Sequence, residues 1–161
     1  MKLVVDTSAL LSLACSNYFE ILLKENKFII TNSVLEELKT FTIYDDFLGT
    51  KAKEILKKEF KIKNPIKLID LNLEKTEIEV FSLALEEKCL SLTDDIHAAR
   101  VAKSKLSLDV KPSFYLILEL YKRNKIKKSD LIKDIKLILN NRNWLNSALG
   151  EYFLQILESI K

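Results

Sequence analysis

A short apolar run that ends in an acid, KLVVD at residues 2–6, constrains the fold of this chain more than any other feature. A run of aliphatic residues without polar alternation is typical of a central parallel strand that is buried on both faces. Asp6 would then lie at the carboxyl end of the strand, where ligands bind in open α/β sheets. A carboxylate at such a buried position needs a partner. The run therefore predicts both a fold class and a first candidate site residue.

Beyond this run, short segments with strand character alternate with longer segments of helical periodicity. Strands are predicted at residues 2–6, 28–32, 66–71 and 89–95, and helices at residues 8–26, from residue 34, and at 50–63, 76–88 and 96–105. The pair Asn64-Pro65 should stop the third of these helices, because the residue before a proline avoids helical geometry. Such alternation predicts an α/β fold with a central parallel sheet flanked by helices.

The last third of the chain is predicted to contain helices alone, at residues 113–123, 129–140 and 143–160. Because the 161 residues include only two glycines and two prolines, we expect no flexible linker. We expect a single domain with an α/β core at residues 1–112 and an all-helical C-terminal extension at residues 113–161.

The extension carries two apolar stripes, one at residues 113–121 and one formed by Trp144, Leu145, Leu149, Tyr152, Phe153 and Ile156. One small core can hide one such stripe, and a second is more easily buried if two copies pair. We therefore expect a homodimer. The alternative is an extension folded wholly onto its own core.

Acidic residues recur where the predicted strands end or helices begin: Asp6, Glu37, Glu77, Asp94 and Asp95. In a parallel sheet the carboxyl ends of all strands share one edge, so these residues are expected to converge. Crowded carboxylates raise one another's pKa unless a cation compensates their charge. Oxygen ligands of this kind suit Mg²⁺ or Mn²⁺. Each acid taken alone also has an ordinary interpretation, since acids favour the first turn of a helix and Asp95 could be a helix N-cap.

The remaining polar features of the sequence carry weaker signals. His97 is expected on the surface of a helix, and Cys15 and Cys89 are expected to be buried free thiols. Two basic runs, at residues 51–63 and 122–128, are interpreted as solvated helix faces and turns, with a phosphate-binding rim as the alternative. A net charge of +3 does not by itself indicate nucleic-acid binding.

The apolar runs near residues 3–14 and 114–121 are too short to cross a bilayer. Asp6 interrupts the N-terminal apolar stretch, which argues against a secretory signal. A cytoplasmic protein without a membrane segment is expected.

Four motifs, in this order, resemble the PIN domain: VVDTSAL at residues 4–10, SVLEEL at 33–38, TEIEVFSLALEE at 76–87 and SLTDDIHAARVA at 91–102. Within that family the chain looks like the VapC-related branch of predicted nucleic-acid-binding proteins. Two departures matter. The helix predicted at residues 76–88 opens with Thr-Glu where relatives often have Gly-Glu, so either Glu77 or Glu79 can belong to the acidic set. Asp-Val-Lys-Pro at residues 109–112 replaces a Gly-containing turn that is common in this branch.

The resemblance implies a PIN-like fold and an endoribonuclease that depends on Mg²⁺ or Mn²⁺. The acidic set that it implies is Asp6, Glu37, Glu77 and Asp95, with Asp94 as a further ligand or supporting contact and with Thr7, Ser8 and Thr93 positioning them. RNA is the implied substrate, and a small antitoxin protein is a partner if the chain is the toxin of a toxin–antitoxin pair. The alternative is a catalytically inactive PIN-like module that binds RNA or a protein.

Two other families of acidic α/β proteins fit less well. A HAD phosphatase needs a second Asp two residues after the first, where this chain has Ser8, and a receiver domain needs its acidic pair near the start.

Overall fold

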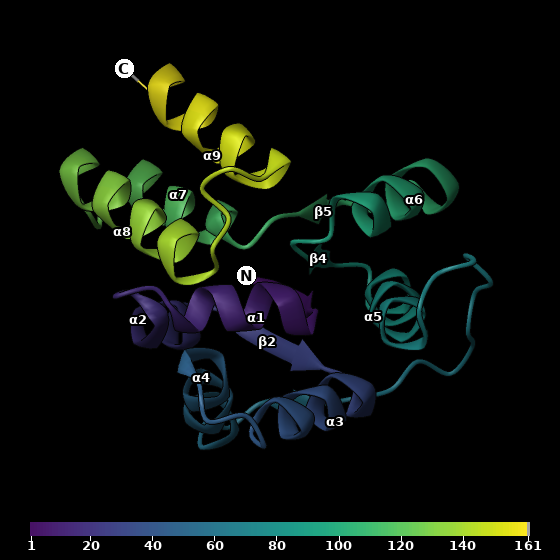
Figure 1. The fold of residues 1–161 in the computed structure, drawn as a ribbon. Helices are drawn as coiled ribbons and strands as arrows, with labels where there is room; N and C mark the ends of the chain where they lie inside the picture. The colour runs from purple at the N-terminus through teal and green to yellow at the C-terminus, as the bar shows by residue number, and fades with distance from the viewer. Residues whose placement is uncertain (161) are drawn as a thin grey trace.

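The computed structural model of the protein describes residues 1–160 (Figure 1). Its sheet has the strand order β3-β2-β1-β4-β5, and every neighbouring pair is parallel. The strands are β1 (Lys2–Val5), β2 (Lys27–Ile30), β3 (Lys61–Ile62), β4 (Leu90–Leu92) and β5 (Val110–Lys111). The strand predicted first, β1, lies at the centre, where Leu3, Val4 and Val5 are fully buried.

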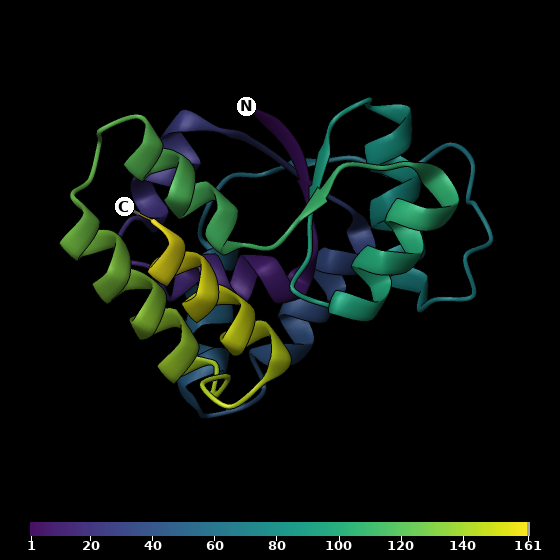
Figure 2. The ribbon, with the colours of Figure 1, turned by 90° about the horizontal axis from the view of Figure 1, so that it is seen from above.

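Helices cover the sheet and form the extension. They are α1 (Thr7–Ala14), α2 (Phe19–Glu25), α3 (Asn32–Phe41), α4 (Phe47–Leu56), α5 (Lys75–Glu86), α6 (Ile96–Leu106), α7 (Phe114–Lys122), α8 (Lys128–Asn141) and α9 (Ala148–Ser159). α5 packs on β1 and β4, α2 on β2, and α6 on β5. Seen from above, α5 and α6 lie on one side of the molecule and α7, α8 and α9 on the other (Figure 2). The predicted α/β class, with a flanked parallel sheet and a helical extension, is confirmed.

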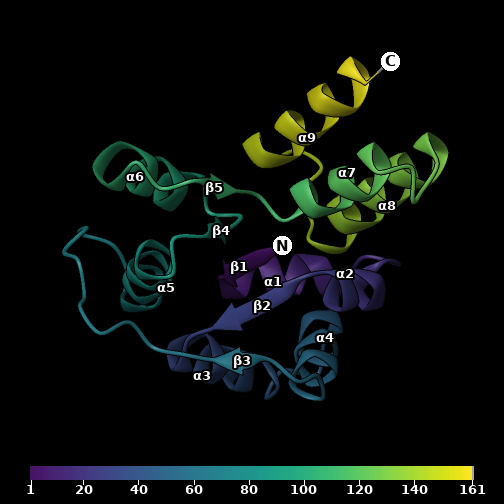
Figure 3. The ribbon, with the colours of Figure 1, turned by 180° about the vertical axis from the view of Figure 1, so that it is seen from behind.

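The strand predicted at residues 66–71 is wrong, since the third strand is β3, which pairs with β2 through Ile29 with Lys61 and Ile30 with Ile62 (Figure 3). The side chains of Ile66 and Leu68 are 93% and 54% exposed. The backbone N–H groups of Ile66 and Lys67 donate to the carboxylate of Glu86, each at 2.9 Å, so a side chain takes the donors that a ladder would use. An apolar composition without burial did not make a strand.

Two predicted helices have different limits in the structure. The helix predicted at 50–63 is α4, which begins at Phe47 after the side chain of Asp46 accepts from the Gly49 N–H at 2.7 Å. It ends at Leu56, and the chain then enters β3. The helix predicted at 8–26 is interrupted between α1 and α2, where Asp134 of α8 accepts from the Ser16 hydroxyl and from the Asn17 N–H.

The short strand β5 was not predicted. It has two residues, too few to show a periodicity, and it pairs with β4 through Ser91 with Val110 and Leu92 with Lys111. Residues 109–112, which the sequence left as a departure from a family turn, therefore form the outer edge of the sheet.

The three helices of the extension are confirmed, although α9 begins at Ala148, after Ser147 caps it by accepting from the Gly150 N–H at 3.0 Å. Most apolar residues of the extension are buried or partly buried within the one chain. The centroids of the Phe114 and Phe153 rings lie 3.8 Å apart. Leu145 and Tyr152 stay exposed. The stripe at residues 113–121 is thus covered by the chain itself, whereas of the second stripe only Leu149 and Phe153 are buried. The homodimer stays a prediction, with less support than the two stripes gave it.

None of the helices within residues 1–160 is long and apolar enough to cross a membrane.

Candidate functional site

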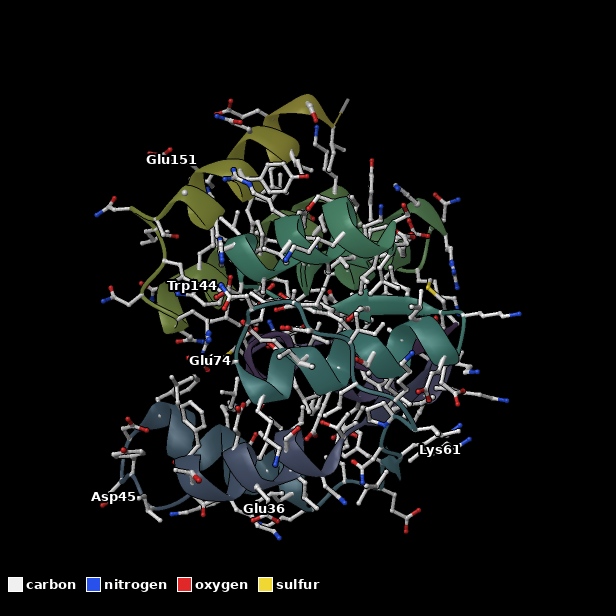
Figure 4. All side chains as sticks on the ribbon, turned by 90° about the vertical axis from the view of Figure 1, so that its right-hand side faces the viewer. Glu36, Asp45, Lys61, Glu74, Trp144 and Glu151 are labelled. Carbon is white, nitrogen blue, oxygen red and sulfur yellow. The ribbon has the colours of Figure 1, made fainter. Side chains whose placement is uncertain are left out.

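A cleft of ≈ 190 Å³ opens at the carboxyl edge of the sheet and gathers four of the five predicted acids. Its lining consists of Asp6, Thr7, Ser8, Leu11, Glu37, Phe41, Glu74, Thr76, Glu77, Asp95 and Arg142. Figure 4 shows Glu74, at the start of α5, and Trp144, in the extension, on the same side of the molecule. We refer to this hollow as the acid cleft.

Asp6 follows β1 directly, and its backbone N–H donates to the Leu92 carbonyl of β4 at 2.9 Å. The side chain is only 7% exposed. One of its oxygens, Oδ2, accepts from the Ser8 hydroxyl at 2.7 Å and from the Thr93 hydroxyl at 3.0 Å. Burial raises the pKa of Asp6, the two hydroxyls lower it, and the nearby charge of Glu37 raises it again. The fold therefore holds a carboxylate at a position where its negative charge is costly.

Glu37 reaches the acid cleft from α3, a helix whose N-terminus is capped by Thr31. Its Oε2 accepts from the Thr7 hydroxyl at 2.5 Å, and its Oε1 accepts from the Thr76 hydroxyl. Threonines from α1 and α5 thus orient both oxygens. The structure places Thr7, Ser8 and Thr93 in contact with the acids, as the resemblance implied.

Glu77 lies in the first turn of α5, where its Oε2 accepts from the Glu74 N–H at 3.1 Å as part of a capping box. Its pKa is raised by burial and by the charges of Asp95 and Asp6. Glu79, the open alternative, instead accepts from Ser33 and pairs with Lys75 in a separate hollow. Glu77 therefore lines the acid cleft, whereas Glu79 lines a neighbouring hollow that shares Glu37 and Thr76 with the cleft.

The neighbouring acids Asp94 and Asp95 have different surroundings. Asp95 caps α6 by accepting from the Ala98 N–H at 2.8 Å, and it lines the acid cleft. Asp94 is buried and accepts from the Ser113 N–H at 2.8 Å, and its Oδ2 has no hydrogen-bond partner within residues 1–160. Burial raises the pKa of Asp94, while Arg142 lowers it. Asp94 lines the next hollow rather than the acid cleft.

Arg142 is a cleft residue that the sequence did not indicate. It follows α8, its guanidinium lies 4.3 Å from the centre of the Trp144 ring, and it lines the acid cleft. Burial lowers its pKa, the charge of Asp94 raises it, and its Nε is buried without a partner in the described part of the chain. A single Arg between two asparagines gives no signal in a sequence, so only the packing of the extension reveals it.

The two basic runs make ion pairs away from the acid cleft. Lys125 pairs with Glu25, which precedes β2, and Lys122 and Arg123 pair with Glu119. These contacts place the run at residues 122–128 at the amino edge of the sheet, opposite the acids. In the other run, Lys51 pairs with Glu54, Lys58 with Glu20 and Lys63 with Glu87. The interpretation as solvated faces and turns fits these positions better than a phosphate-binding rim.

His97 is exposed on α6 and is not among the residues that line the acid cleft. Cys15 is a buried free thiol whose pKa burial raises to about 11, and Cys89 is free but only partly buried.

The donor chemistry of the acid cleft fits a hard divalent cation. Four carboxylates share a small hollow, and in Glu77 and Asp95 only one oxygen accepts a hydrogen bond from residues 1–160. The other oxygens are free to take a ligand. Across the described residues, however, no group of three or more His, Cys, Asp or Glu side chains stands in an arrangement that already encloses an ion.

The model of a PIN-domain family, DUF3368, matches residues 2–159. Among solved structures, a PilT N-terminus domain protein from the hyperthermophilic archaeon Sulfolobus solfataricus P2 is 23% identical, with a TM-score of 0.54 over 74% of this chain and 92% of that chain. VapBC2 from Rickettsia felis, bound to a DNA fragment from the promoter, is 18% identical, with a TM-score of 0.47 over 70% of this chain and 98% of that chain. At 23% identity the likeness to the archaeal protein concerns the fold alone. No curated protein matches the sequence.

Proposed function

The chain belongs to the PIN-domain family, and from this premise we propose that it is a metal-dependent endoribonuclease that hydrolyses RNA phosphodiester bonds in the acid cleft. The observation that carries the proposal is the convergence of Asp6, Glu37, Glu77 and Asp95 from four separate elements on one hollow. RNA as the substrate is supported by the resemblance of the motifs to VapC-type PIN proteins.

We propose that these four carboxylates hold Mg²⁺ or Mn²⁺. When bound, the ion supplies Lewis acidity, which lowers the pKa of water and offsets the charge of phosphate oxygens. Thr7 and Thr76 keep Glu37 oriented, and Ser8 and Thr93 keep Asp6 oriented, through the hydrogen bonds described above. Oriented ligands lose little entropy when an ion or substrate arrives.

Arg142 has the charge and planar shape to bind a phosphate oxygen in the same cleft. Stacking on Trp144 orients its guanidinium, and the buried charge of Asp94 favours its protonated form. We propose a supporting role for Asp94, which is buried and holds the Ser113 N–H, rather than a role as a direct ligand.

The test is cleavage of a 5′-labelled single-stranded RNA by the purified protein. We expect cutting with Mg²⁺ or Mn²⁺ and none in excess EDTA, and we expect Asp6→Asn to be inactive. Asp45→Asn is the matched control, because Asp45 is an exposed residue between α3 and α4 (Figure 4). Equal cutting in EDTA, or a fully active Asp6→Asn, contradicts the proposal.

One observation favours a second function, an inactive PIN-like module that binds RNA or a protein. Both oxygens of Glu37, and Oδ2 of Asp6, already accept from hydroxyl groups of the chain, and no enclosed ion site is present within residues 1–160. Calorimetric titration with Mn²⁺ separates the two functions, because an inactive module has no reason to bind the ion.

A more specific form of the proposal is the toxin of a toxin–antitoxin pair, supported by the resemblance to VapC-type proteins. A short reading frame beside the gene, whose product binds this protein and blocks cleavage, is the expected finding. The absence of such a frame favours a role in RNA processing or turnover.

A further inference from the structure

A second hollow, with a volume of ≈ 280 Å³, opens on the other side of Asp95 between α6, β5 and the start of α9. We refer to it as the α6–α9 groove. Asp95 lines both this groove and the acid cleft. A chain of linked groups held at the acid cleft can therefore continue past Asp95 into the groove.

The groove has an apolar floor, formed by Ile96, Ala99, Val110, Pro112, Ala148 and Leu149. The volume of the whole groove lies just below the range of pockets that bind small ligands. A floor of this kind and size suits one flat aromatic group and leaves no room for a duplex.

Tyr152 of α9 adds an aromatic ring to this floor, and half of its side chain is exposed. The ring packs at 78° to the buried ring of Phe114, with centroids 6.1 Å apart. An edge-to-face contact with a buried partner fixes the orientation of an aromatic side chain. Tyr152 is thus a supported ring, open to solvent, beside an apolar surface.

Cations stand at the edge of the groove. Arg100 and Lys103 are exposed, lie three residues apart on α6, and form no ion pair with any residue in the range 1–160. Lys111 also lines the groove, but Asp109 holds its ammonium at 2.9 Å. In the runs at residues 51–63 and 122–128, by comparison, six of the eleven cations form an ion pair within residues 1–160, and none of the eleven lines the groove or the acid cleft.

We propose that the α6–α9 groove binds one unpaired nucleotide of the RNA next to the phosphate that is cut, an inference that rests on the proposed nuclease function. The base stacks on Tyr152 above the apolar floor, and Arg100 and Lys103 contact the adjoining phosphates. Stacking on aromatic rings combined with backbone contacts to cations is the general way in which proteins hold single-stranded nucleic acid. The site therefore selects single-stranded over double-stranded RNA.

The test separates binding from cleavage. Fluorescence anisotropy with a short labelled single-stranded RNA is measured in EDTA, where no metal-dependent cutting occurs, and cleavage is measured separately with Mn²⁺. We expect Tyr152→Ala to weaken binding about tenfold and Tyr152→Phe, which keeps the ring, to bind within about twofold of wild type. Tyr44→Ala is the matched control, because Tyr44 is similarly exposed but lies between α3 and α4.

The cations are tested through salt dependence. Arg100→Gln and Lys103→Gln should each lower the slope of log affinity against log salt by about 0.7, the value for one phosphate contact on a single strand. Lys127→Gln, at an exposed position outside the groove, should leave the slope unchanged. These exposed substitutions keep the proposal testable if Tyr152→Ala disturbs folding.

The outcomes distinguish the two proposals. If the wild type cuts RNA but Tyr152→Ala, Arg100→Gln and Lys103→Gln bind as it does, the groove proposal is overturned and the nuclease proposal stands. If binding depends on Tyr152 but no RNA is cut with Mn²⁺, the groove stands as an RNA site and the nuclease proposal fails. Equal affinity for a blunt RNA duplex contradicts the single-nucleotide site.

Discussion

The acid cleft and the α6–α9 groove share Asp95 but differ in chemistry. The cleft is lined mainly by carboxylates and hydroxyl groups with one cation, Arg142, whereas the groove is lined mainly by apolar residues, Tyr152 and three cations, together with Thr93, Asp94 and Asp95. A phosphate approaching the cleft is repelled unless a metal ion is present, whereas a phosphate approaching Arg100 and Lys103 at the edge of the groove is attracted without it. We therefore assign cleavage to the acid cleft and RNA binding to the groove. Variants of the cleft should change the cleavage rate, and variants of the groove should change the RNA affinity.

The largest expected effect is that of Asp6→Asn on cleavage. We expect the rate with Mn²⁺ to fall by a factor on the order of a hundred or more, because one of the proposed ligands loses its charge. Binding of RNA in EDTA should be unchanged or tighter, since a negative charge near the phosphate is removed. Weaker RNA binding by Asp6→Asn, measured by anisotropy, would break the division between cleft and groove.

The same substitution should change the dependence of stability on pH in metal-free buffer. Burial raises the pKa of Asp6 in the folded state above its ordinary value of 3.8. The free energy of unfolding should therefore fall as the pH rises from that value through the folded-state pKa, because ionisation is opposed only in the folded protein. Urea denaturation between about pH 4 and pH 8 should show a smaller fall for Asp6→Asn. An identical fall in both proteins would contradict the buried charge.

Arg142→Ala should have the next largest effect. We expect cleavage to fall by about tenfold to a hundredfold, with Arg142→Lys recovering only part, because a point charge cannot reproduce a stacked planar guanidinium. The effect is measured as the single-turnover cleavage rate at saturating and at subsaturating protein concentrations. Arg123→Ala is the matched control, because Arg123 lies at the opposite edge of the sheet and pairs with Glu119. If the two variants cut RNA equally fast, Arg142 has no role in the cleft.

Asp134→Ala tests how firmly the extension is attached to the core. This attachment matters for the α6–α9 groove, because α9 forms one wall of the groove. Asp134 accepts from Ser16 and Asn17, and its loss should leave these groups without a partner and cost about 1–3 kcal/mol of stability. We propose that core and extension form one domain and unfold together. Thermal unfolding should thus show a single transition at a lower temperature. Two separated transitions would mean that the extension detaches while the core stays folded.

The local parts of the fold were predictable from the sequence, and the contacts made by tertiary packing were not. Asp6 could be predicted because a buried strand and its final acid are adjacent in the chain, and Glu37 and Glu77 followed from their places on the next helices. The strand at residues 66–71 failed because the sequence does not reveal that Glu86 takes the backbone donors there. Arg142 was missed because α8 brings it to the cleft from a distant part of the chain.

The cations illustrate the same limit. The runs at residues 51–63 and 122–128 drew attention because their charges are close in sequence, yet many of their charges are neutralised by nearby acids. The cations beside the candidate site are Arg100 and Lys103 of α6 and Arg142, which follows α8, and the fold brings them together.

Lys125→Gln should have the smallest effect. Its ion pair with Glu25 lies at the amino edge of the sheet, and partly exposed pairs contribute less than about 1 kcal/mol. We expect cleavage and RNA binding within about twofold of wild type, measured as above. A large loss of RNA binding would instead show that RNA contacts the amino edge of the sheet, and it would weaken the assignment of RNA binding to the groove.

Calorimetric titration of the metal-free protein with Mn²⁺ tests the central claim most directly, because it asks whether the acid cleft holds a divalent ion without depending on the choice of RNA. We predict saturable binding to the wild type and to Asp45→Asn, and a loss of binding in Asp6→Asn while its folded structure is kept. Absence of saturable binding to the wild type, or equal binding by Asp6→Asn, would contradict a metal site built from Asp6, Glu37, Glu77 and Asp95.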